Sequence, residues 1–369
     1  MRVVLINGRE DSLRNPGGDT VQLDKTKAAL ENLGVETLSR HLDELENLPS
    51  CDVAHLFNIQ MPDTAWIAFK TLQGKGIPTV LSPIYWDLLA YWYDMAIKER
   101  KRWRMLASRF GKPVVRRLYT NWQRLKYPAK TLWRLRRRLL QQAQRILPNS
   151  QSEADLLKWE FVLHGDFQRR VDVVPNGIDT DLYRHLPAPS QAFFQKYGVR
   201  DFVLEVGMIY PVKNQLGLID AAFDLPVSLV FLGQIHPAFQ AYGEACKARG
   251  EQRGQVIFID RLPHDELPGI YALAAVHALP SWRETPGLVS LEAAAAGCRV
   301  VTTSIGSAKD YFGEMAWYCE PDDLSSIRKA VECALQSPAS PGLRQRVMEE
   351  FNWQRAGEAT LAAYQKTLA

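Results

Sequence analysis

Residues 279–301 read LPSWRETPGLVSLEAAAAGCRVV, and the rest of the chain is organised around this stretch. An apolar run, VHALPS, ends in a short polar loop, a helix signal follows, and a second apolar run, CRVVTTS, comes next. Thr285 is a good N-cap, Pro286 stands at the expected first helical position, and Gly287 leaves the first turn open. A helix that starts at the carboxyl end of a strand presents free backbone N–H groups, so the pattern predicts an anion site.

Two glutamates flank this predicted helix start. Glu284 lies just before it, and Glu292 lies eight residues later, about two turns into the helix, so both carboxylates can face one cleft. By count alone, such a pair is usually a cap and a surface residue. Beside a helix start that cradles phosphate, the pair indicates a nucleotide-sugar site.

Length and composition predict a globular protein of two domains. The chain has 369 residues, of which 46% are hydrophobic and 23% charged. Five cysteines, an odd number, argue against a disulfide framework and favour a reducing compartment. The first apolar run, RVVLING, is too short for a signal peptide, and no run approaches the roughly 20 apolar residues of a transmembrane helix.

Apolar runs alternate with helical stretches in both halves of the chain. RVVLING, CDVAHLFN and GIPTVLSP are strand candidates in the first half, with helices expected at about 20–33 and 64–73. FVLEVG, SLVFLG, QVIFID and VHALPS repeat the pattern in the second half. The alternation predicts an α/β fold of two doubly wound, Rossmann-like domains facing a cleft, divided at PNGID, with a linker at 180–199.

Two loops of the first half could face that cleft. Gly17 and Gly18 lie between the first strand and its helix, although a Gly-Gly pair is also common in plain turns. SPIYWD follows the strand GIPTVLSP and contains Tyr85 and Asp87, which either contact an acceptor sugar or pack as an aromatic loop on their own domain. Further on, Ser152 can cap a helix that begins in QSEADLL.

The alternation stops at about 88–142, where the chain becomes helical in pattern and strongly basic. Between Lys98 and Arg145 there are 17 Lys or Arg residues and one acid, Glu99, which gives this window a charge of +16 and the remainder −12. Apolar residues recur there at spacings of three and four, with arginines between them. The apolar set is Leu118, Trp122, Leu125, Leu132, Leu135 and Leu139, and the arginines are Arg134, Arg136, Arg137 and Arg138.

A basic amphipathic segment that also contains Trp103, Trp122 and Trp133 favours an anionic membrane surface. Nucleic acid is an alternative partner, because basic residues with aromatics also suit phosphates and bases. A solvated helical face is the third interpretation, and the ratio of 17 basic residues to one acid weakens it.

Three cations of the second half are candidates for contact with phosphate. Lys213 follows the strand FVLEVG in a strand-to-helix loop, although most lysines are simply surface residues. Arg261, just after QVIFID, can reach the same cleft, and Arg283 precedes Glu284.

Five ordered motifs resemble those of the family 4 retaining glycosyltransferases, which have the GT-B fold and include bacterial envelope and exopolysaccharide enzymes. They include PNGID, then G-x5-K-N from Gly207 to Asn214, then PSxxExxGLVxLEAxAxGxxVV. FNWQRAGEATLAAY resembles the family's terminal helix, which crosses back to the first domain. The resemblance implies an acceptor-binding domain at 1–177 with a basic insertion at about 88–142, a nucleotide-sugar domain at 178–350, and a crossing helix at 351–369.

The same resemblance implies roles for the glutamates and the lysine. Glu292 is expected to accept hydrogen bonds from the ribose of the donor, and Glu284 to bind the transferred sugar. Lys213 is expected to neutralise the departing diphosphate, which is electrostatic catalysis without a metal or other cofactor. Gly207 and the N–H groups near Gly287, Leu288 and Val289 complete the donor site.

Two positions depart from the family pattern. Met208 stands where the family usually has an arginine that pairs with the lysine on the diphosphate, so Arg283 or Arg261 must replace it or donor binding changes. Ile84 and Tyr85 occupy a loop in which the family commonly has a histidine.

The sequence thus predicts a metal-independent glycosyltransferase on the cytoplasmic face of the cell membrane. Its expected partners are a nucleotide sugar, a lipid-linked or cell-envelope glycan acceptor and an anionic membrane surface, with nucleic acid less favoured. A GT-B enzyme with a soluble sugar acceptor, such as a sucrose-phosphate or trehalose synthase-like enzyme, is the first alternative. A non-catalytic relative that binds sugar nucleotides is the second.

Overall fold

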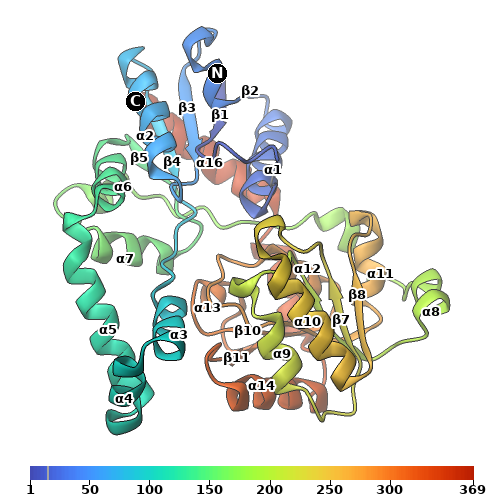
Figure 1. Ribbon diagram of the computed structural model, residues 1–369. Coiled ribbons are helices and arrows are strands. Elements are labelled where there is room, and N and C mark those ends of the chain that lie inside the picture. Colours follow the sequence, from blue (N-terminus) through green and yellow to red (C-terminus); the bar gives the residue numbers. More distant parts are fainter. Residues whose placement is uncertain (15) are drawn as a thin grey trace. The chain divides into compact units, whose positions relative to one another are not determined.

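The computed structural model describes residues 1–14 and 16–369, and Asn15, the first residue of the NPGGD loop, lies outside the described residues. The chain divides into two compact units. The first unit comprises Met1–Asn176 together with Trp353–Ala369, and the second comprises Gly177–Asn352. Each unit is an α/β structure built on a parallel sheet (Figure 1).

The sheet of the first unit has the strand order β2-β1-β3-β4-β5. The strands are β1 (Arg2–Asn7), β2 (Glu36–Arg40), β3 (Val53–Phe57), β4 (Thr79–Ser82) and β5 (Arg145–Ile146). All neighbours pair in parallel. This is a flavodoxin-like order, and its reversal between β1 and β3 is where such sheets bind ligands, outside the carboxyl ends of the strands.

Helices cover both faces of this sheet, because strands such as β1 and β3 are apolar on both sides and need cover on each. The helices that cover the sheet are α1 (Gly18–Asn32), α2 (Pro62–Gly74), α6 (Thr131–Gln142), α7 (Gln151–Glu160) and α16 (Trp353–Leu368), and the unit also contains α3 (Leu89–Glu99), α4 (Lys101–Phe110) and α5 (Lys112–Lys126). One core lies under α2, α6 and α7 and contains Leu56 and Leu139. The other lies under α1 and α16 and contains Leu5 and Tyr364.

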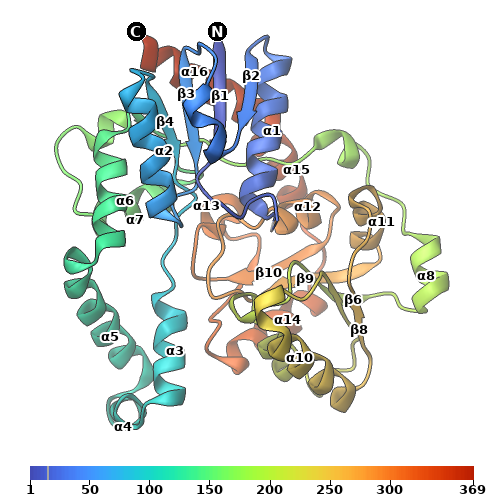
Figure 2. The ribbon, with the colours of Figure 1, turned by 45° about the horizontal axis from the view of Figure 1, so that its top comes forward.

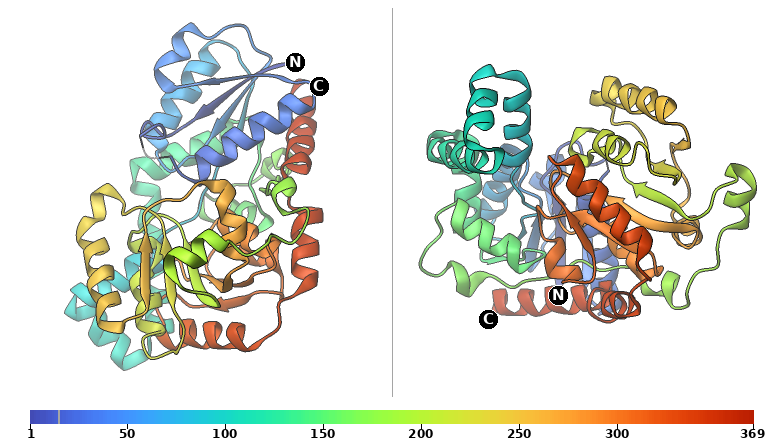
Figure 3. Two further views of the ribbon diagram at one scale, coloured as in Figure 1. Left: turned by 90° about the vertical axis from the view of Figure 1, so that its right-hand side faces the viewer. Right: turned by 90° about the horizontal axis from the view of Figure 1, so that it is seen from below.

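The last helix, α16, packs beside α1, although more than 300 residues separate them in the chain (Figure 3). The Tyr364 hydroxyl lies 2.7 Å from Nδ1 of His55 on β3, and Nε2 of the same ring lies 2.9 Å from the Ser82 hydroxyl on β4. All three side chains are buried, so these hydrogen bonds satisfy polar groups inside the core. The predicted return of the final helix to the first domain is confirmed.

The basic insertion forms α3 to α6, and α3, α4 and α5 project away from the sheet of their unit in both views (Figures 1 and 2). These three helices have a small core of their own, in which Tyr93, Ala107 and Tyr119 are buried. Beyond the insertion, Ser150 rather than Ser152 caps α7, because the Ser150 hydroxyl accepts the Glu153 N–H at 3.0 Å.

The sheet of the second unit has the order β11-β10-β9-β6-β7-β8, again entirely parallel. The strands are β6 (Phe202–Val206), β7 (Leu229–Leu232), β8 (Val256–Ile259), β9 (Ala274–Leu279), β10 (Arg299–Thr303) and β11 (Trp317–Cys319). Numbered within the unit, this is the 3-2-1-4-5-6 order of a Rossmann sheet, with the reversal between β6 and β9.

Two apolar cores lie on the two faces of this sheet. One contains Leu218, Cys246 and Val331 from α9, α10 and α14, and the other contains residues of α11, α12, α13 and α15. The helices are α8 (Gln191–Tyr197), α9 (Gln215–Ala221), α10 (Gln240–Arg253), α11 (Leu267–Tyr271), α12 (Leu288–Ala295), α13 (Ala308–Phe312), α14 (Leu324–Gln336) and α15 (Pro341–Glu350). Two doubly wound α/β units were predicted, and the structure confirms them.

Candidate functional site

In the second unit, the strand-order reversal brings together the loops after β6 and β9. The first loop runs over residues 207–214 and the second over 280–287, and β6 and β9 are direct neighbours in the sheet. Trp282 N–H donates to the Val212 carbonyl oxygen at 2.8 Å, so the two loops are also joined through their backbones. The predicted donor residues therefore lie where a Rossmann sheet binds its ligand.

Lys213 and Glu284 form an ion pair across these loops, with Nζ 2.7 Å from Oε2. The two side chains are only 18% and 10% exposed. Burial alone lowers the pKa of Lys213, but the charges of Glu284, Tyr210 and Glu205 and the hydrogen bond to Glu284 outweigh it and raise the pKa above its ordinary value. Lys213 thus carries a positive charge that is held in place.

Asn214 fixes the backbone beside this lysine. It has a left-handed conformation, with φ +66°, and its Nδ2 donates to the carbonyl oxygens of Pro280 and Pro321 at 3.1 and 3.0 Å. One asparagine side chain therefore ties the loop after β6 to two other loops of the unit. Because Lys213 is the preceding residue, these hydrogen bonds also fix the position of its backbone.

Two glycines, Gly306 and Gly287, pack against Glu284 at positions where no side chain would fit. Ser307 N–H donates to the Glu284 carbonyl oxygen at 3.0 Å, and a Cβ atom on Gly306 would lie 2.0 Å from that oxygen. A Cβ on Gly287 would lie 2.9 Å from Cγ of Glu284. The sequence therefore places glycine wherever the Glu284 segment packs most closely.

The helix after this loop begins at Leu288, not at Pro286 with Thr285 as its cap. Gly287 is the N-cap and has φ +80°, which is not a right-handed helical conformation, so the helix starts only after it. Within the part of the chain that the structure describes, the N–H groups of Leu288 and Val289 have no hydrogen-bond acceptor. The predicted open helix start is present, two residues later than expected.

Glu292 has partners different from those of Glu284. Its Oε1 lies 2.9 Å from Nε2 of His264, and its Oε2 accepts from the Tyr271 hydroxyl at 3.5 Å. His264 is exposed, whereas Tyr271 is buried. A carboxylate held from two sides in this way has a fixed orientation from which it can accept hydrogen bonds from a ligand.

Sequence reasoning did not identify two buried polar residues below the site. Glu205 is buried in the middle of β6, and burial raises its pKa well above the ordinary value, opposed by the charge of Lys213. His277 of β9 is fully buried, with Nε2 3.0 Å from the Ser290 hydroxyl, and burial lowers its pKa to about 3. The one available signal was an acid and a histidine inside otherwise apolar strands.

The remaining predicted donor residues lie around the same loops. Gly207 ends β6 with φ +148°, and Met208, which follows it, is partly exposed. Gln215 Nε2 donates to the Met208 carbonyl oxygen at 3.2 Å. Arg283 is partly buried and Arg261 is exposed.

The first unit has its own polar cluster at the reversal between β1 and β3. Asp19 is buried on the first turn of α1 and accepts from Asn7 Nδ2, Arg9 Nη1 and Asn58 Nδ2 at 3.0 to 3.1 Å. Gly17 is the N-cap of α1, so the predicted glycine loop leads directly into this cluster. Sequence reasoning did not identify Asp19, which looks like an ordinary helix-start acid.

A cavity of about 650 Å³ opens beside this cluster, at the carboxyl ends of β1 and β2. Its lining includes Arg9, Asp11, Arg14, His41 and Thr64. Gly17, Gly18, Tyr85 and Asp87, the residues predicted for an acceptor, are not part of this lining.

Tyr85 does not face a ligand cavity, and its predicted contact with an acceptor is wrong. Its ring is buried, its N–H donates to Glu153 Oε1 at 2.6 Å, and its hydroxyl donates to Glu160. Asp87 pairs with Arg124 at 2.9 Å. The aromatic-loop interpretation of SPIYWD is the correct one for Tyr85.

Two residues predicted for a membrane surface also have structural roles. Trp133 is 6% exposed, with its ring centroid 5.6 Å from that of Phe161, because it lies on the same side of α6 as buried Leu140. Arg136 donates to the carbonyl oxygens of Ile59 and Gln60 at 3.0 and 2.7 Å. The Trp133 ring therefore belongs mainly to the core of its unit, and Arg136 fixes the backbone of Ile59 and Gln60.

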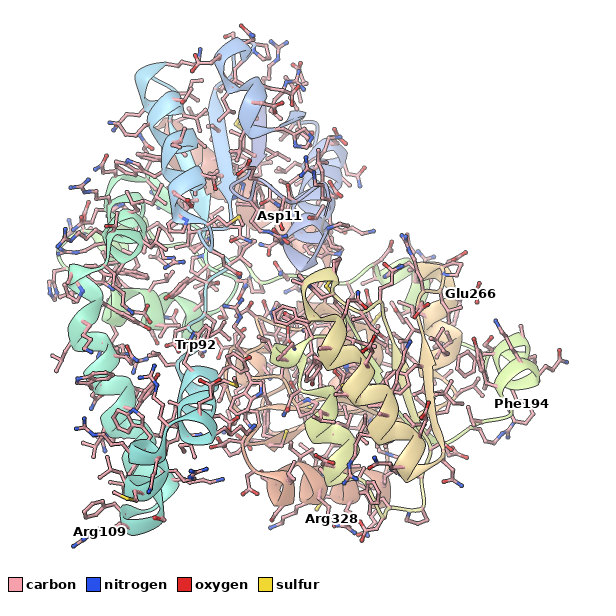
Figure 4. All side chains as sticks on the ribbon, viewed as in Figure 1. Asp11, Trp92, Arg109, Phe194, Glu266 and Arg328 are labelled. Carbon is pink, nitrogen blue, oxygen red and sulfur yellow. The ribbon has the colours of Figure 1, made fainter. Side chains whose placement is uncertain are left out.

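The exposed apolar residues of the insertion lie elsewhere. Val114, Leu118, Trp122 and Leu125 recur at spacings of four, four and three along α5 and are all exposed. Leu118 and Leu125 are 59% and 83% exposed. Figure 4 shows Arg109 near the tip of the projecting helices, whereas Trp92 lies at their other end, in the first turn of α3. We call the α5 residues the apolar stripe.

Within residues 1–14 and 16–369, no helix is long and apolar enough to cross a bilayer. No group of three or more His, Cys, Asp or Glu side chains there is arranged to hold a metal ion.

Two doubly wound units, the second with Rossmann strand order and an open helix start at its reversal, define the GT-B class of fold. A family model described as glycosyl transferases group 1 matches residues 190–350, and one described as glycosyltransferase family 4 matches residues 33–182. The chain belongs to the family 4 glycosyltransferases.

Similar proteins agree with this class. D-inositol 3-phosphate glycosyltransferases of Mycobacterium bovis and Mycobacterium tuberculosis are 27% identical over 249 residues, covering 62% of this chain and 50% of the relative. The chain thus spans about half the length of the curated relatives it matches.

Two solved structures have the same fold. Sucrose-phosphate synthase from Thermosynechococcus elongatus has a TM-score of 0.74 at 17% identity, covering 99% of this chain and 98% of that one. Anabaena HepE in complex with UDP and glucose has a TM-score of 0.63 at 17% identity, covering 100% and 95%.

Proposed function

We propose that this protein is a retaining, metal-independent glycosyltransferase that transfers a sugar from a nucleotide-sugar donor to a lipid-linked or cell-envelope glycan. The observation that supports it most is the Lys213–Glu284 pair beside the N–H groups of Leu288 and Val289, which have no acceptor among the described residues. A cation and a helix start next to one another are suited to a diphosphate. The family to which the chain belongs supports the same reaction class.

In this proposal the diphosphate of the donor competes with Glu284 for Lys213. Lys213 then stabilises the negative charge that develops on the leaving group, without a metal ion. Once its hydrogen bond to the lysine is broken, Glu284 accepts a hydrogen bond from a hydroxyl group of the transferred sugar. The Glu284 side chain is thus kept in place until the donor arrives.

Glu292 binds the ribose of the donor in the same proposal. Its contacts with His264 and Tyr271 orient the carboxylate from two sides, which suits a pair of vicinal hydroxyls. The base of the nucleotide stays open, because no side chain in this region indicates a preference.

The insertion supports an acceptor at the cytoplasmic face of the cell membrane. The apolar stripe on α5 is flanked by basic residues, which suits a helix lying in the interface of an anionic bilayer. Leu118→Gln and Leu125→Gln should each reduce flotation with phosphatidylglycerol vesicles about tenfold, the size expected for an exposed leucine that enters the bilayer. Leu186→Gln, an equally exposed leucine of the second unit, is the matched control.

A soluble acceptor is the alternative within the same reaction class. Similar proteins are named for inositol phosphate and sucrose phosphate. The 650 Å³ cavity of the first unit has both basic and acidic side chains in its lining, which suits the hydroxyl groups of a soluble sugar. A non-catalytic sugar-nucleotide-binding relative is the other alternative, favoured by Met208.

One experiment separates these possibilities. Donor hydrolysis and transfer are measured with UDP, GDP, ADP and TDP sugars, first alone and then with membrane extract or with sugar phosphates. Sugar transfer that occurs with membrane extract but not with sugar phosphates supports a membrane acceptor. Sugar transfer to a sugar phosphate supports the soluble alternative. Binding without turnover under every condition identifies a non-catalytic protein, and normal turnover by Glu284→Ala contradicts the proposed site.

A further inference from the structure

A second cavity, of about 400 Å³, lies on the outer side of α6 in the first unit. Its polar lining consists of Arg134, Arg137, Arg138 and Gln141, and it contains no acidic side chain. The spacings of three, four and seven place these four residues on one face of the helix. The sequence singled out the arginine run, but the donor site does not use it.

The three arginines differ in how far other groups engage them. Arg134 Nε donates to the Pro128 carbonyl oxygen at 2.7 Å. Among the described residues, neither Arg137 nor Arg138 forms a hydrogen bond or an ion pair, and Nε of Arg137 is buried. By contrast, the adjacent Arg136 donates two hydrogen bonds to backbone carbonyl oxygens of its own unit. The cavity therefore contains guanidinium groups whose donors are unused.

The rest of the lining is apolar. It consists of Pro128, the buried ring of Trp133, and Val162 just after α7. The Arg137 guanidinium lies 5.7 Å from the centre of the Trp133 ring, which orients its planar donors. An arginine cluster against an apolar wall suits a ligand with a phosphate at one end and a hydrocarbon body at the other, since guanidinium groups pair with phosphate oxygens in bidentate fashion.

We propose that this cavity binds the phosphate of an anionic glycerophospholipid head group. Its volume lies within the range of small-ligand sites, about 300–1,000 Å³. The short helix at Tyr127–Ala129 links α6 directly to α5, so the same unit offers the apolar stripe for the bilayer and the cavity for one head group. The inference rests on the membrane-surface part of the proposed function and does not depend on glycosyl transfer.

Dihexanoyl phosphatidylglycerol, kept below its critical micelle concentration, tests the cavity without a membrane surface. Calorimetric titration into the full chain should show saturable binding at one site. Arg137→Gln should weaken that binding at least tenfold, and Arg138→Gln, an exposed position, is the second variant in case the first is unstable. Arg117→Gln removes the same charge from α5, outside the cavity, and should change the dissociation constant less than twofold.

Several results would overturn the proposal. Absence of saturable binding does so, as does equal weakening by Arg117→Gln and Arg137→Gln, which indicates only diffuse charge. Inorganic phosphate that binds as tightly as the lipid, with the same loss in Arg137→Gln, identifies a site for free phosphate. A single-stranded oligonucleotide that displaces the lipid identifies a nucleic-acid site instead. Donor hydrolysis and vesicle flotation by the unaltered chain are measured separately, so failure of the proposed function is a different result from failure of the cavity.

Discussion

Glu284→Gln tests the idea that Glu284 and the donor diphosphate compete for Lys213. The substitution keeps the shape of the side chain and one acceptor for Nζ, but removes the charge from a 2.7 Å ion pair that is mostly shielded from water. At an effective dielectric constant of about 20, such a pair attracts by about 6 kcal/mol before desolvation is counted. Removing one partner of a buried pair typically costs about 3–5 kcal/mol, and the retained hydrogen bond reduces this to about 2–3 kcal/mol.

The expected results differ between the free and the ligand-bound protein. For a unit of this size, 2–3 kcal/mol lowers the unfolding temperature of the free protein by about 4–12 °C. Binding of the nucleoside diphosphate should be unchanged or up to about tenfold tighter in Glu284→Gln, because Lys213 no longer has to leave a carboxylate. Sugar transfer should fall at least about a hundredfold, as for other electrostatic groups at a reacting centre.

Differential scanning fluorimetry with and without the nucleoside diphosphate, calorimetry and a transfer assay measure these three quantities. Glu251→Gln, an exposed acid on α10, is the matched control and should change none of them. Lys213→Met should instead weaken diphosphate binding strongly. If Glu284→Gln weakens diphosphate binding more than tenfold while its unfolding temperature stays normal, the competition does not exist. Near-normal transfer by that variant would refute the role of Glu284 altogether.

Three further predictions follow from the local geometry. Gly306→Ala should destabilise the fold by more than about 3 kcal/mol in chemical denaturation, since its Cβ meets the Glu284 backbone, whereas Gly254→Ala has open space and should cost only about 1 kcal/mol for its positive φ. Burial raises the pKa of Glu160 to about 7 from 4.5, so the folded state holds this proton more tightly than the unfolded state, and stability declines between pH 4.5 and 7. Glu160→Gln should therefore match the unaltered chain at pH 4.5 and exceed it by about 1–3 kcal/mol at pH 8, and an unchanged difference across this range contradicts the assignment. Met208→Arg should tighten nucleoside diphosphate binding about tenfold in calorimetry if this position faces the diphosphate, and no change would place it elsewhere.

The fold was predictable because its signals are local. Continuous apolar runs such as VVLI and FVLEV, separated by helical stretches, specify parallel strands covered on both faces. The position of the loops proposed to bind the donor was predictable for the same reason, since each motif lies within a few residues of a strand end. The exact start of α12 was not, because the N-cap depends on the conformation of Gly287 rather than on the capping preference of Thr285.

Buried polar residues were not predictable, because their meaning depends on distant parts of the chain. Asp19 gains its role from Asn7 and Asn58, and Glu153 from the backbone N–H groups of Tyr85 and Asn149. Trp133 is a similar case. The sequence grouped it with the tryptophans expected at the surface, but its position on α6 places its ring in the core. After folding, the charge run therefore divides into Arg136, which supports the fold, and Arg137 and Arg138, which form no hydrogen bond or ion pair among the described residues.

The charge balance below the donor site bears on the missing arginine at position 208. Lys213 lies near two acids, Glu284 and Glu205, and if both were ionised the three groups would carry a net charge of −1 and oppose a diphosphate. Burial raises the pKa of Glu205 and favours its neutral form, so Lys213 and Glu284 balance one another. In the proposed reaction, a sugar hydroxyl donates to Glu284 and a diphosphate oxygen takes its place beside Lys213, at a site that has no net negative charge. The burial of Glu205 in β6 thus keeps the proposed donor site from repelling an anion, although position 208 holds a methionine rather than the arginine of the family pattern.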